Sequence, residues 1–217
     1  RKRIMKKKVF NLIIVDESGS MSCIEKQALA GMNETLSTIA KMDKMHENME
    51  QLTTLITFDS DHRNFIFDNV PAGKLRQMTA KDYRPCGGTP LYDAIGIGIA
   101  KVNALTSADD NVLVTIITDG EENCSVEYNL KMVKNLIEKL KKQNWTFTFI
   151  GTEDLDVEGI ACGMGIDNHL SFKQDVEGTR AMFLKESACR AKYCACVSTG
   201  NMSNADSYFD DADDKDY

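Results

Sequence analysis

The chain has 217 residues, of which 42% are hydrophobic and 27% are charged, and its formal net charge is −7. This length and composition are typical of one full-sized soluble α/β domain with its own hydrophobic core. The negative charge argues against nucleic acid as the main partner, because phosphate binding requires a basic face. No secretory signal is visible, and no apolar run approaches the ~20 residues that a membrane span needs.

Alternating apolar runs and helical patterns predict the fold. Strands are expected at 9–15, 52–58, 64–70, 112–118, 145–150 and 170–172, and helices at 22–43, 91–105, 128–144, 157–164 and 178–196. The link between the second and third strands is short, so these two should be antiparallel, with the third at an edge. We expect a three-layer, doubly wound, mostly parallel sheet of Rossmann-like type, with one antiparallel edge strand and helices on both faces.

The two ends of the chain are rich in charged residues of opposite sign. Segment 1–7 is basic, whereas segment 198–217 closes on the acidic run FDDADDKDY. We expect 1–7 to be a solvated leader, 8–197 to be the folded domain, and 198–217 to be an acidic, disordered tail. A nucleic-acid arm or a membrane tether is the alternative interpretation of the leader.

The seven cysteines are odd in number and do not form the pattern of a small secreted scaffold. Reduced thiols in the cytoplasm are therefore expected. Cys189, Cys194 and Cys196 cluster within one predicted helix, but zinc would need a fourth ligand, and no histidine is near in sequence. We expect these three thiols to be inert and partly buried.

Oxygen-bearing side chains follow two of the predicted strands and precede one predicted helix. These candidate ligands are Asp16, Ser18 and Ser20 after the first strand, Thr89 before the helix at 91, and Asp119 after the strand 112–118. In an open parallel sheet, ligands bind outside the carboxyl ends of the strands, near the point where strand order reverses. The three loops are therefore expected to meet in one small volume.

The chemistry of these donors indicates a hard cation. Every donor is an oxygen, which excludes zinc and copper as the preferred ions. Two carboxylates with neutral hydroxyls suit Mg²⁺, with Mn²⁺ or Ca²⁺ as substitutes. Two carboxylates balance the charge of the ion, so a vertex of its coordination shell can accept an external Glu or Asp oxygen.

The segments DESGS, GGTPLYDA and TDGEEN resemble, in this order, the metal-ion-dependent adhesion site of von Willebrand factor A and integrin I-type domains. The resemblance covers residues 8–185 and implies a non-enzymatic protein-binding module. It implies that Mg²⁺ held at Asp16, Ser18, Ser20, Thr89 and Asp119 grips a Glu or Asp side chain of a partner protein. The residues of GGTPLYDA and TDGEEN are most similar to those of cytosolic prokaryotic members of the family, such as the tellurite-resistance-associated proteins. This resemblance implies a bacterial, cytoplasmic protein.

Several alternatives stay open at this level. Asp and Ser are common in turns and caps, so the first loop can be explained by local backbone contacts alone. An aspartyl-phosphate phosphatase would need an aspartate at Ser18, and no histidine accompanies a serine nucleophile at a strand end. A metal-dependent hydrolase or phosphotransfer component, and a scaffold subunit of a chelatase-like complex, are the alternative functions.

Four smaller expectations complete the sequence-based description. Ser22 and Glu25 should form a capping box that opens the first helix. Glu121 and Glu122 should be the acidic start of a helix rather than the rim of the site. His62 should be solvated in a turn. The tail carboxylates Asp210, Asp211 and Asp213 are candidates to mimic a partner's acid at the metal.

Overall fold

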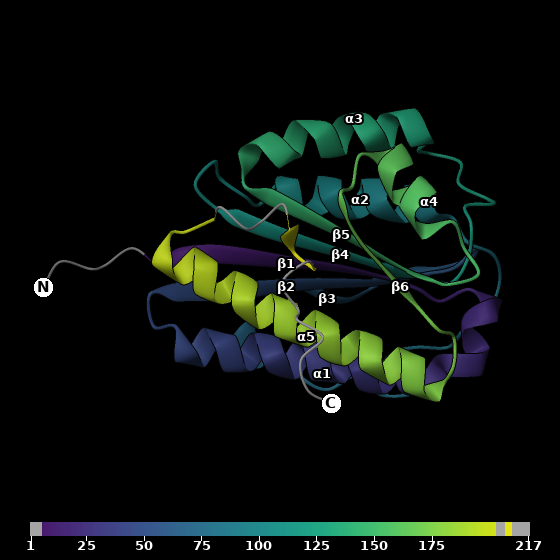
Figure 1. The fold of residues 1–217 in the computed structure, drawn as a ribbon, viewed down its shortest axis with the longest axis horizontal. Helices are drawn as coiled ribbons and strands as arrows, with labels where there is room; N and C mark the ends of the chain where they lie inside the picture. The colour runs from purple at the N-terminus through teal and green to yellow at the C-terminus, as the bar shows by residue number, and fades with distance from the viewer. Residues whose placement is uncertain (1–5, 203–206, 210–217) are drawn as a thin grey trace, which may run out of the picture.

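A computed structural model describes residues 6–202 and 207–209, and the strands of this part form one six-stranded sheet in the order β3-β2-β1-β4-β5-β6 (Figure 1). The strands are β1 (Lys7–Asp16), β2 (Met49–Phe58), β3 (Arg63–Pro71), β4 (Asn111–Thr118), β5 (Trp145–Thr152) and β6 (Asn168–Phe172). All neighbouring pairs are parallel except β2 and β3, which are antiparallel. The predicted fold class is therefore confirmed.

Five α-helices cover the two faces of this sheet in the described residues. They are α1 (Glu25–Met45), α2 (Leu91–Asn103), α3 (Leu130–Leu140), α4 (Val157–Met164) and α5 (Val176–Thr199). Helices α1 and α5 lie against one face, and α2, α3 and α4 lie against the other (Figure 1). Short 3₁₀ helices precede α1 (η1, Gly19–Ile24), follow β3 (η2, Ala72–Lys74) and follow α3 (η3, Lys141–Gln143).

The alternation of side chains along β1 divides the core into two layers. Val9, Ile13 and Val15 pack in the layer under α1 and α5. The intervening residues Leu12 and Ile14 pack in the layer under α2, α3 and α4. Because both faces are covered, β1 is apolar almost without interruption, as expected for a central parallel strand.

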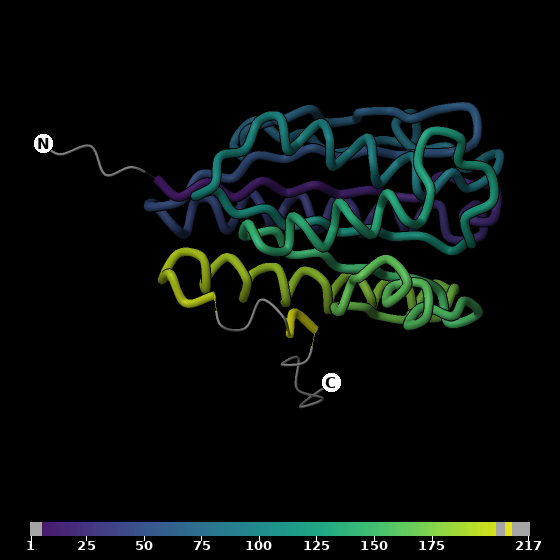
Figure 2. The backbone as a smooth tube through the Cα atoms, turned by 90° about the horizontal axis from the view of Figure 1, so that it is seen from above, coloured from purple at the N-terminus to yellow at the C-terminus, as the bar shows by residue number. Residues whose placement is uncertain are grey.

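The position of β1 between β2 and β4 creates the reversal of strand order. The chain leaves β1 toward α1 on one face, and it reaches β4 through α2 on the other face (Figures 1 and 2). The chain therefore continues from β1 and from β4 toward opposite faces of the sheet, at the place where open α/β sheets bind ligands. Asp16 ends β1, and Asp119 follows directly after β4.

The predicted capping box is wrong. The chain begins to coil at Gly19, in η1, and α1 starts at Glu25 without a side-chain cap. Ser22 therefore lies inside η1 and does not cap α1.

The end of the chain also differs from the expectation of a disordered tail from residue 198. Helix α5 continues to Thr199, and the side chains of Tyr208 and Phe209 are buried against the layer under α1 and α5. Two aromatic side chains bury enough apolar surface to hold this short segment in place, despite the acidic residues around it. Residues 1–5 of the expected leader, and Asp210, Asp211 and Asp213, lie outside the described residues.

Among the helices of the described part, none is long and apolar enough to cross a membrane.

Candidate cation site

Asp16 is the fixed point of the site at the carboxyl end of β1. Its carboxylate is completely buried, and Oδ1 accepts the backbone N–H of Ser18 at 2.7 Å. Oδ2 accepts the hydroxyl of Thr118, the last residue of β4, at 2.6 Å. The Tyr83 hydroxyl donates to the backbone carbonyl of Asp16 at 2.7 Å. These contacts tie the end of β1 to the end of β4 and fix the orientation of the carboxylate.

The two serines of the first loop reach across to Asp119. Ser20 Oγ donates to Asp119 Oδ1 at 2.8 Å, and Ser18 Oγ lies 3.4 Å from the same oxygen. The two hydroxyl oxygens are 3.1 Å apart. The spacing of alternate residues in DESGS therefore presents both hydroxyls to one carboxylate directly after the neighbouring strand.

Thr89 faces the same space from the loop before α2. Gly120 lies close to both Thr89 and Asp16. A β-carbon at this glycine would lie 3.0 Å from Thr89 Oγ1 and 3.8 Å from Asp16 Oδ2. The backbone of Thr89 is paired in both directions with Asn123, whose side chain accepts at 2.9 Å and whose N–H donates at 3.1 Å. The three predicted loops are thus brought together, and we call the five residues Asp16, Ser18, Ser20, Thr89 and Asp119 the oxygen cluster.

The loops of the oxygen cluster are also tied to one another through their backbones. The Gly19 N–H donates to the Gly87 carbonyl at 3.1 Å, and the Cys86 N–H donates to the Glu17 carbonyl at 2.8 Å. Gly87 has a φ of +68°, a conformation that favours glycine. These bonds hold the segment that carries Thr89 beside the loop that carries Ser18.

Burial makes both carboxylates of the cluster unfavourable as anions in the absence of a cation. It raises the pKa of Asp16 to about 6, against the hydrogen bonds from Thr118 and Ser18, which lower it. Burial also raises the pKa of Asp119, while hydrogen bonds from Ser20 and Gln174 act in the opposite direction. A nearby positive charge would relieve this cost.

The donor set of the oxygen cluster fits a hard divalent cation. Its donors are two carboxylates and three hydroxyls, with no nitrogen or sulfur among them, and this is the chemistry that Mg²⁺ and Ca²⁺ prefer. Two buried carboxylates with raised pKa values match the charge of one divalent ion. The residues present are therefore compatible with the ion that the sequence motifs imply.

Sequence reasoning missed the residues that support this cluster from outside the motifs. Gln174, between β6 and α5, donates from its side-chain amide to Asp119 Oδ2. Thr118 and Tyr83 hold Asp16 as described above. A single glutamine before a helix carries no sequence signal, whereas Thr118 lies inside the motif TDGEEN and was readable as a neighbour of Asp119.

The expected acidic helix start at Glu121 and Glu122 is also wrong. Helix α3 begins later, at Leu130, with Asn129 as its cap. Glu122 instead accepts the N–H of Tyr92 in the first turn of α2 at 2.9 Å and the N–H groups of Cys124 and Ser125. Its carboxylate satisfies amides that the first turn of a helix leaves unpaired, and so joins the loop after β4 to α2.

A second carboxylate completes this connection. Asp93, buried in the first turn of α2, accepts the N–H groups of Val126, Glu127 and Tyr128. The loop from Asp119 to Tyr128 is therefore anchored on α2 by side chains rather than by a helix of its own. This anchoring places the loop that carries Asp119 against the helix that follows Thr89.

Comparisons with known proteins support the fold and not a specific identity. No protein-family model matches the chain, and no curated protein matches it. The structure is similar to the vWF domain of the type V pili tip protein Mfa5 from Porphyromonas gingivalis, with a TM-score of 0.57 and 10% identity over 90% of this chain and 95% of that one. It is also similar to the SpRpn10 VWA domain, with a TM-score of 0.53 and 14% identity over 84% and 95%.

Longer proteins contain the same arrangement. Proximal thread matrix protein 1 from the mussel byssus matches with a TM-score of 0.61 and 12% identity, over 87% of this chain and 47% of that one. The chain thus spans about half the length of that protein, and it covers 31% of the pilus adhesin SpaC from Lactobacillus rhamnosus GG. These comparisons show that the chain has a von Willebrand factor A-like fold.

Proposed function

We propose that the chain is a non-catalytic protein-binding module that holds a divalent cation, preferably Mg²⁺, at the oxygen cluster. The convergence of the three loops carries this proposal: Ser20 Oγ lies 2.8 Å from Asp119 Oδ1, and Thr118 joins Asp16 to the end of β4. The bound ion would supply a Lewis-acidic vertex for a Glu or Asp side chain of the partner. Mn²⁺ and Ca²⁺ are the expected substitutes.

Each residue of the cluster has a separate task in this proposal. Asp16 and Asp119 supply the negative charge that balances the ion, and the Thr118 hydroxyl keeps Asp16 oriented. Ser18, Ser20 and Thr89 are neutral donors that add no further charge, so the site can still attract an external carboxylate. The Gln174 amide on Asp119 Oδ2 restrains this side chain and would have to yield if that oxygen were needed by the ion.

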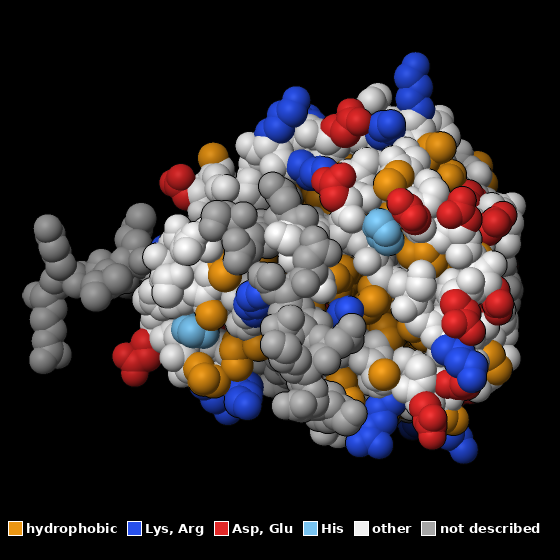
Figure 3. Space-filling model, viewed as in Figure 1, with side chains coloured by type: hydrophobic (Ala, Val, Ile, Leu, Met, Phe, Trp, Pro, Cys, Tyr) orange, Lys and Arg blue, Asp and Glu red, His pale blue; other side chains and the backbone are white. Residues whose placement is uncertain are grey.

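The surface around the site favours the arrival of cations. Acidic side chains gather at the end of the molecule where η1 lies in Figure 1, as the red groups of Figure 3 show. A field of this sign raises the local concentration of divalent ions. It also repels a bare acidic peptide, so we propose a partner that surrounds its acidic residue with basic ones.

The same proposal extends to the cellular location. All seven cysteines lie among the described residues, and none of them forms a disulfide. Unpaired thiols favour a reducing compartment. Together with the motif resemblance to tellurite-resistance-associated proteins, this supports a bacterial, cytoplasmic protein. No specific observation favours a metal-dependent hydrolase, a phosphotransfer component or a chelatase-like scaffold.

The first test measures the ion itself. Metal-free protein is titrated with Mg²⁺ by calorimetry, and we expect about one ion per chain. Asp119→Ala and Ser18→Ala should each weaken binding at least about tenfold, because each removes a donor of the cluster. Ser22→Ala is the matched control, since Ser22 is exposed in η1 and lies outside the cluster, and it should bind like the wild type.

The second test measures the partner. The immobilised chain is exposed to a bacterial lysate in Mg²⁺ and in EDTA, and proteins retained only in Mg²⁺ are identified. Asp119→Ala should lose the same proteins while its circular dichroism spectrum stays unchanged. Partner binding that is equal in Mg²⁺, in EDTA and in the Asp119 variant would refute the proposal. Turnover of generic phosphatase substrates by the wild type would favour the enzymatic alternative instead.

A further inference from the structure

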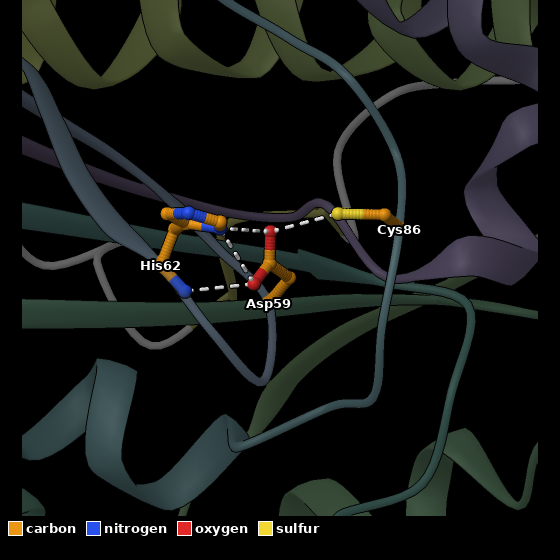
Figure 4. A group of neighbouring side chains, drawn as sticks. All are labelled: Asp59, His62 and Cys86. Carbon is orange, nitrogen blue, oxygen red and sulfur yellow. Dashed lines mark hydrogen bonds and ion pairs between the residues drawn. The ribbon is translucent and has the colours of Figure 1, made fainter.

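A second group of ligand-type side chains lies beside the oxygen cluster and shares none of its residues. Asp59 and His62 come from the turn between β2 and β3, and Cys86 comes from the loop before α2 (Figure 4). One donor atom from each residue lies within 4.8 Å of the others. Within the described residues, this is the group of Asp, His and Cys side chains that meets that condition. His62 is exposed in this turn, as the sequence predicts, and its ring lies against Asp59.

The hydrogen bonds of Asp59 leave one of its carboxylate oxygens for a ligand. Oδ1 accepts the backbone N–H groups of Asp61 and His62 at 2.6 and 2.7 Å. Oδ2 lies 3.3 Å from His62 Nδ1 and 3.3 Å from Cys86 Sγ. Figure 4 shows the imidazole ring and the thiol on opposite sides of this oxygen, both directed toward it. Backbone amides therefore hold Oδ1 of Asp59, and Oδ2 faces the imidazole of His62 and the thiol of Cys86.

The two separations from Asp59 Oδ2 fit a tetrahedral ion. Zinc bonds of about 2.0 Å to nitrogen and oxygen and about 2.3 Å to sulfur place neighbouring ligands roughly 3.3–3.6 Å apart. The two measured distances from Asp59 Oδ2 fall at the short end of this range. His62 Nδ1 and Cys86 Sγ, which lie within 4.8 Å of each other, would also have to approach the same ion. Both side chains are exposed and can rotate, whereas Asp59 is buried.

Glu17 supplies an independent sign that a ligand belongs at this place. Its side chain is only 4% exposed, and it lines the same pocket as Asp59, His62 and Cys86, with a volume of about 470 Å³. Glu17 Oε1 accepts the N–H of Arg84, but the buried Oε2 has no hydrogen-bond partner. A buried carboxylate oxygen without a partner is costly, and a cation or a water bound to one would satisfy it.

We propose that Asp59, His62 and Cys86 bind a thiophilic divalent cation, with zinc as the ion that their geometry fits best. Sulfur and imidazole nitrogen select zinc over magnesium, so this site and the oxygen cluster take different ions. Three protein ligands leave the fourth position for water, in the pocket that Glu17 also lines. Binding converts the Cys86 thiol to a thiolate and releases its proton to solvent.

The arrangement does not fit a nucleophilic cysteine. In such a site the imidazole lies between the thiol and the carboxylate and lowers the pKa of the thiol. Here the carboxylate lies between the other two, and its hydrogen bond with the thiol raises the pKa of Cys86. A cation reverses this effect by stabilising the thiolate.

Occupancy of this site would act on the oxygen cluster through a short connection. The Cys86 N–H donates to the Glu17 carbonyl, next to Asp16, and Cys86 precedes Thr89 by three residues. An ion on the Cys86 side chain would therefore restrain the segment that presents Thr89. This is a link between two loops and requires no movement of the sheet.

The experiment uses metal-free, reduced full chain titrated with Zn²⁺ alone and, separately, with Co²⁺ as a spectroscopic probe. We expect about one zinc ion at this site, and a cobalt complex with sulfur-to-metal charge-transfer absorption and the intense visible bands of tetrahedral cobalt. Cys86→Ser should abolish the charge-transfer band, and His62→Ala should weaken zinc binding at least about tenfold. Cys162→Ser, which changes another exposed free thiol, is the matched control and should keep both signals.

A second control separates the two sites. Asp119→Ala removes a carboxylate of the oxygen cluster and should leave the cobalt–thiolate band unchanged. If magnesium does not bind to the oxygen cluster, the zinc proposal is unaffected. If zinc does not bind to Asp59, His62 and Cys86, the magnesium proposal is unaffected. Zinc affinity that survives both Cys86→Ser and His62→Ala, or a cobalt complex without a thiolate band, would overturn the proposal.

Discussion

Asp16 carries a carboxylate in a fully buried position, where an anion is unfavourable without a compensating charge. Its pKa is raised to about 6 by burial, above the ordinary value of 3.8. Between these values the native state holds a proton that the unfolded state has released. The contribution of Asp16 to stability is therefore fully present below pH 3.8 and is lost as the pH rises to about 6.

Metal-free protein should accordingly lose stability from this residue between about pH 4 and about pH 7, by at most about 3 kcal/mol. The measurement is urea unfolding in EDTA at a series of pH values, compared between the wild type and Asp16→Asn. The difference between the two proteins isolates Asp16 from the other carboxylates. We expect saturating Mg²⁺ to remove most of the loss, because the cation pairs with the ionised form. Parallel pH profiles of the two proteins would contradict this account.

At the scale of single residues, the sequence identified the members of the oxygen cluster and not their supports. Asp16, Ser18 and Ser20 share one loop, and their regular spacing indicates a common direction. Gln174 contacts Asp119 only because β6 and α5 bring it there, so its role depends on tertiary structure. The Asp59, His62 and Cys86 cluster was missed for the same reason, since its residues come from two separate loops.

Among the elements, the pairing of α1 with α5 depends on a glycine. A β-carbon at Gly31 in α1 would lie 2.0 Å from Cδ2 and 2.2 Å from Cγ of Phe183 in α5. Because Cγ is close to the backbone, the ring cannot escape by a small rotation. The two helices can approach each other this closely only when residue 31 has no side chain.

We expect Gly31→Ala to destabilise the protein by about 1–3 kcal/mol, because overpacking exceeds the gain in helix propensity. Gly163 in α4 provides the matched control, since a β-carbon there meets nothing within 4 Å. Gly163→Ala should leave stability unchanged or raise it by up to about 1 kcal/mol. Both variants are measured by urea unfolding. Equal effects of the two substitutions would show that propensity, and not the Phe183 contact, decides the outcome.

The elements that sequence predicted best are the buried strands. β1 and β4 are apolar along almost their whole length, and their ends coincide with polar loops, so their limits are marked in the sequence. The start of α1 was misplaced because η1 continues the loop directly into helical geometry. The helix at 128–144 was predicted too long, because its amphipathic pattern runs on through η3.

For the whole molecule, a buried ion pair joins α5 to the sheet. Arg190 is completely buried and donates to Glu186 at 2.6 and 2.9 Å, to Asn11 in β1 at 2.6 Å and to Thr115 in β4 at 2.8 Å. Glu186 also accepts the hydroxyl of Tyr208 at 3.2 Å. One network therefore connects the last helix, the two central strands and the end of the described chain.

Removing one partner of this pair should be far more costly than replacing both. Arg190→Met leaves Glu186 buried and uncompensated, and we expect a loss of about 3–5 kcal/mol. The double variant Glu186→Gln, Arg190→Met should recover a large part of this loss. Arg180→Met is the control, because Arg180 is exposed on the same helix. A double-mutant cycle from urea unfolding measures the coupling, and additive losses would contradict it.

The order of apolar runs in the sequence predicted the arrangement of strands and helices, but it did not predict the network around Arg190 and Glu186. A fully buried arginine in a helix cannot be distinguished in sequence from a solvated one, because only its surroundings differ. The packing of Tyr208 and Phe209 was hidden in the same way behind an acidic composition. Patterns that repeat along an element are visible in sequence, and contacts between distant elements are not.

The entry of β1 and the exit of α5 have a practical consequence. Lys7 Nζ donates to the Val197 carbonyl at 2.8 Å, so the first strand begins where the last helix finishes (Figures 1 and 2). Asp16 lies at the far end of β1, one strand length away. A fluorescent protein or a surface tether joined directly ahead of Lys7 would project from the corner opposite the oxygen cluster. Immobilisation there leaves the end of the molecule that carries the oxygen cluster open to ligands and partners.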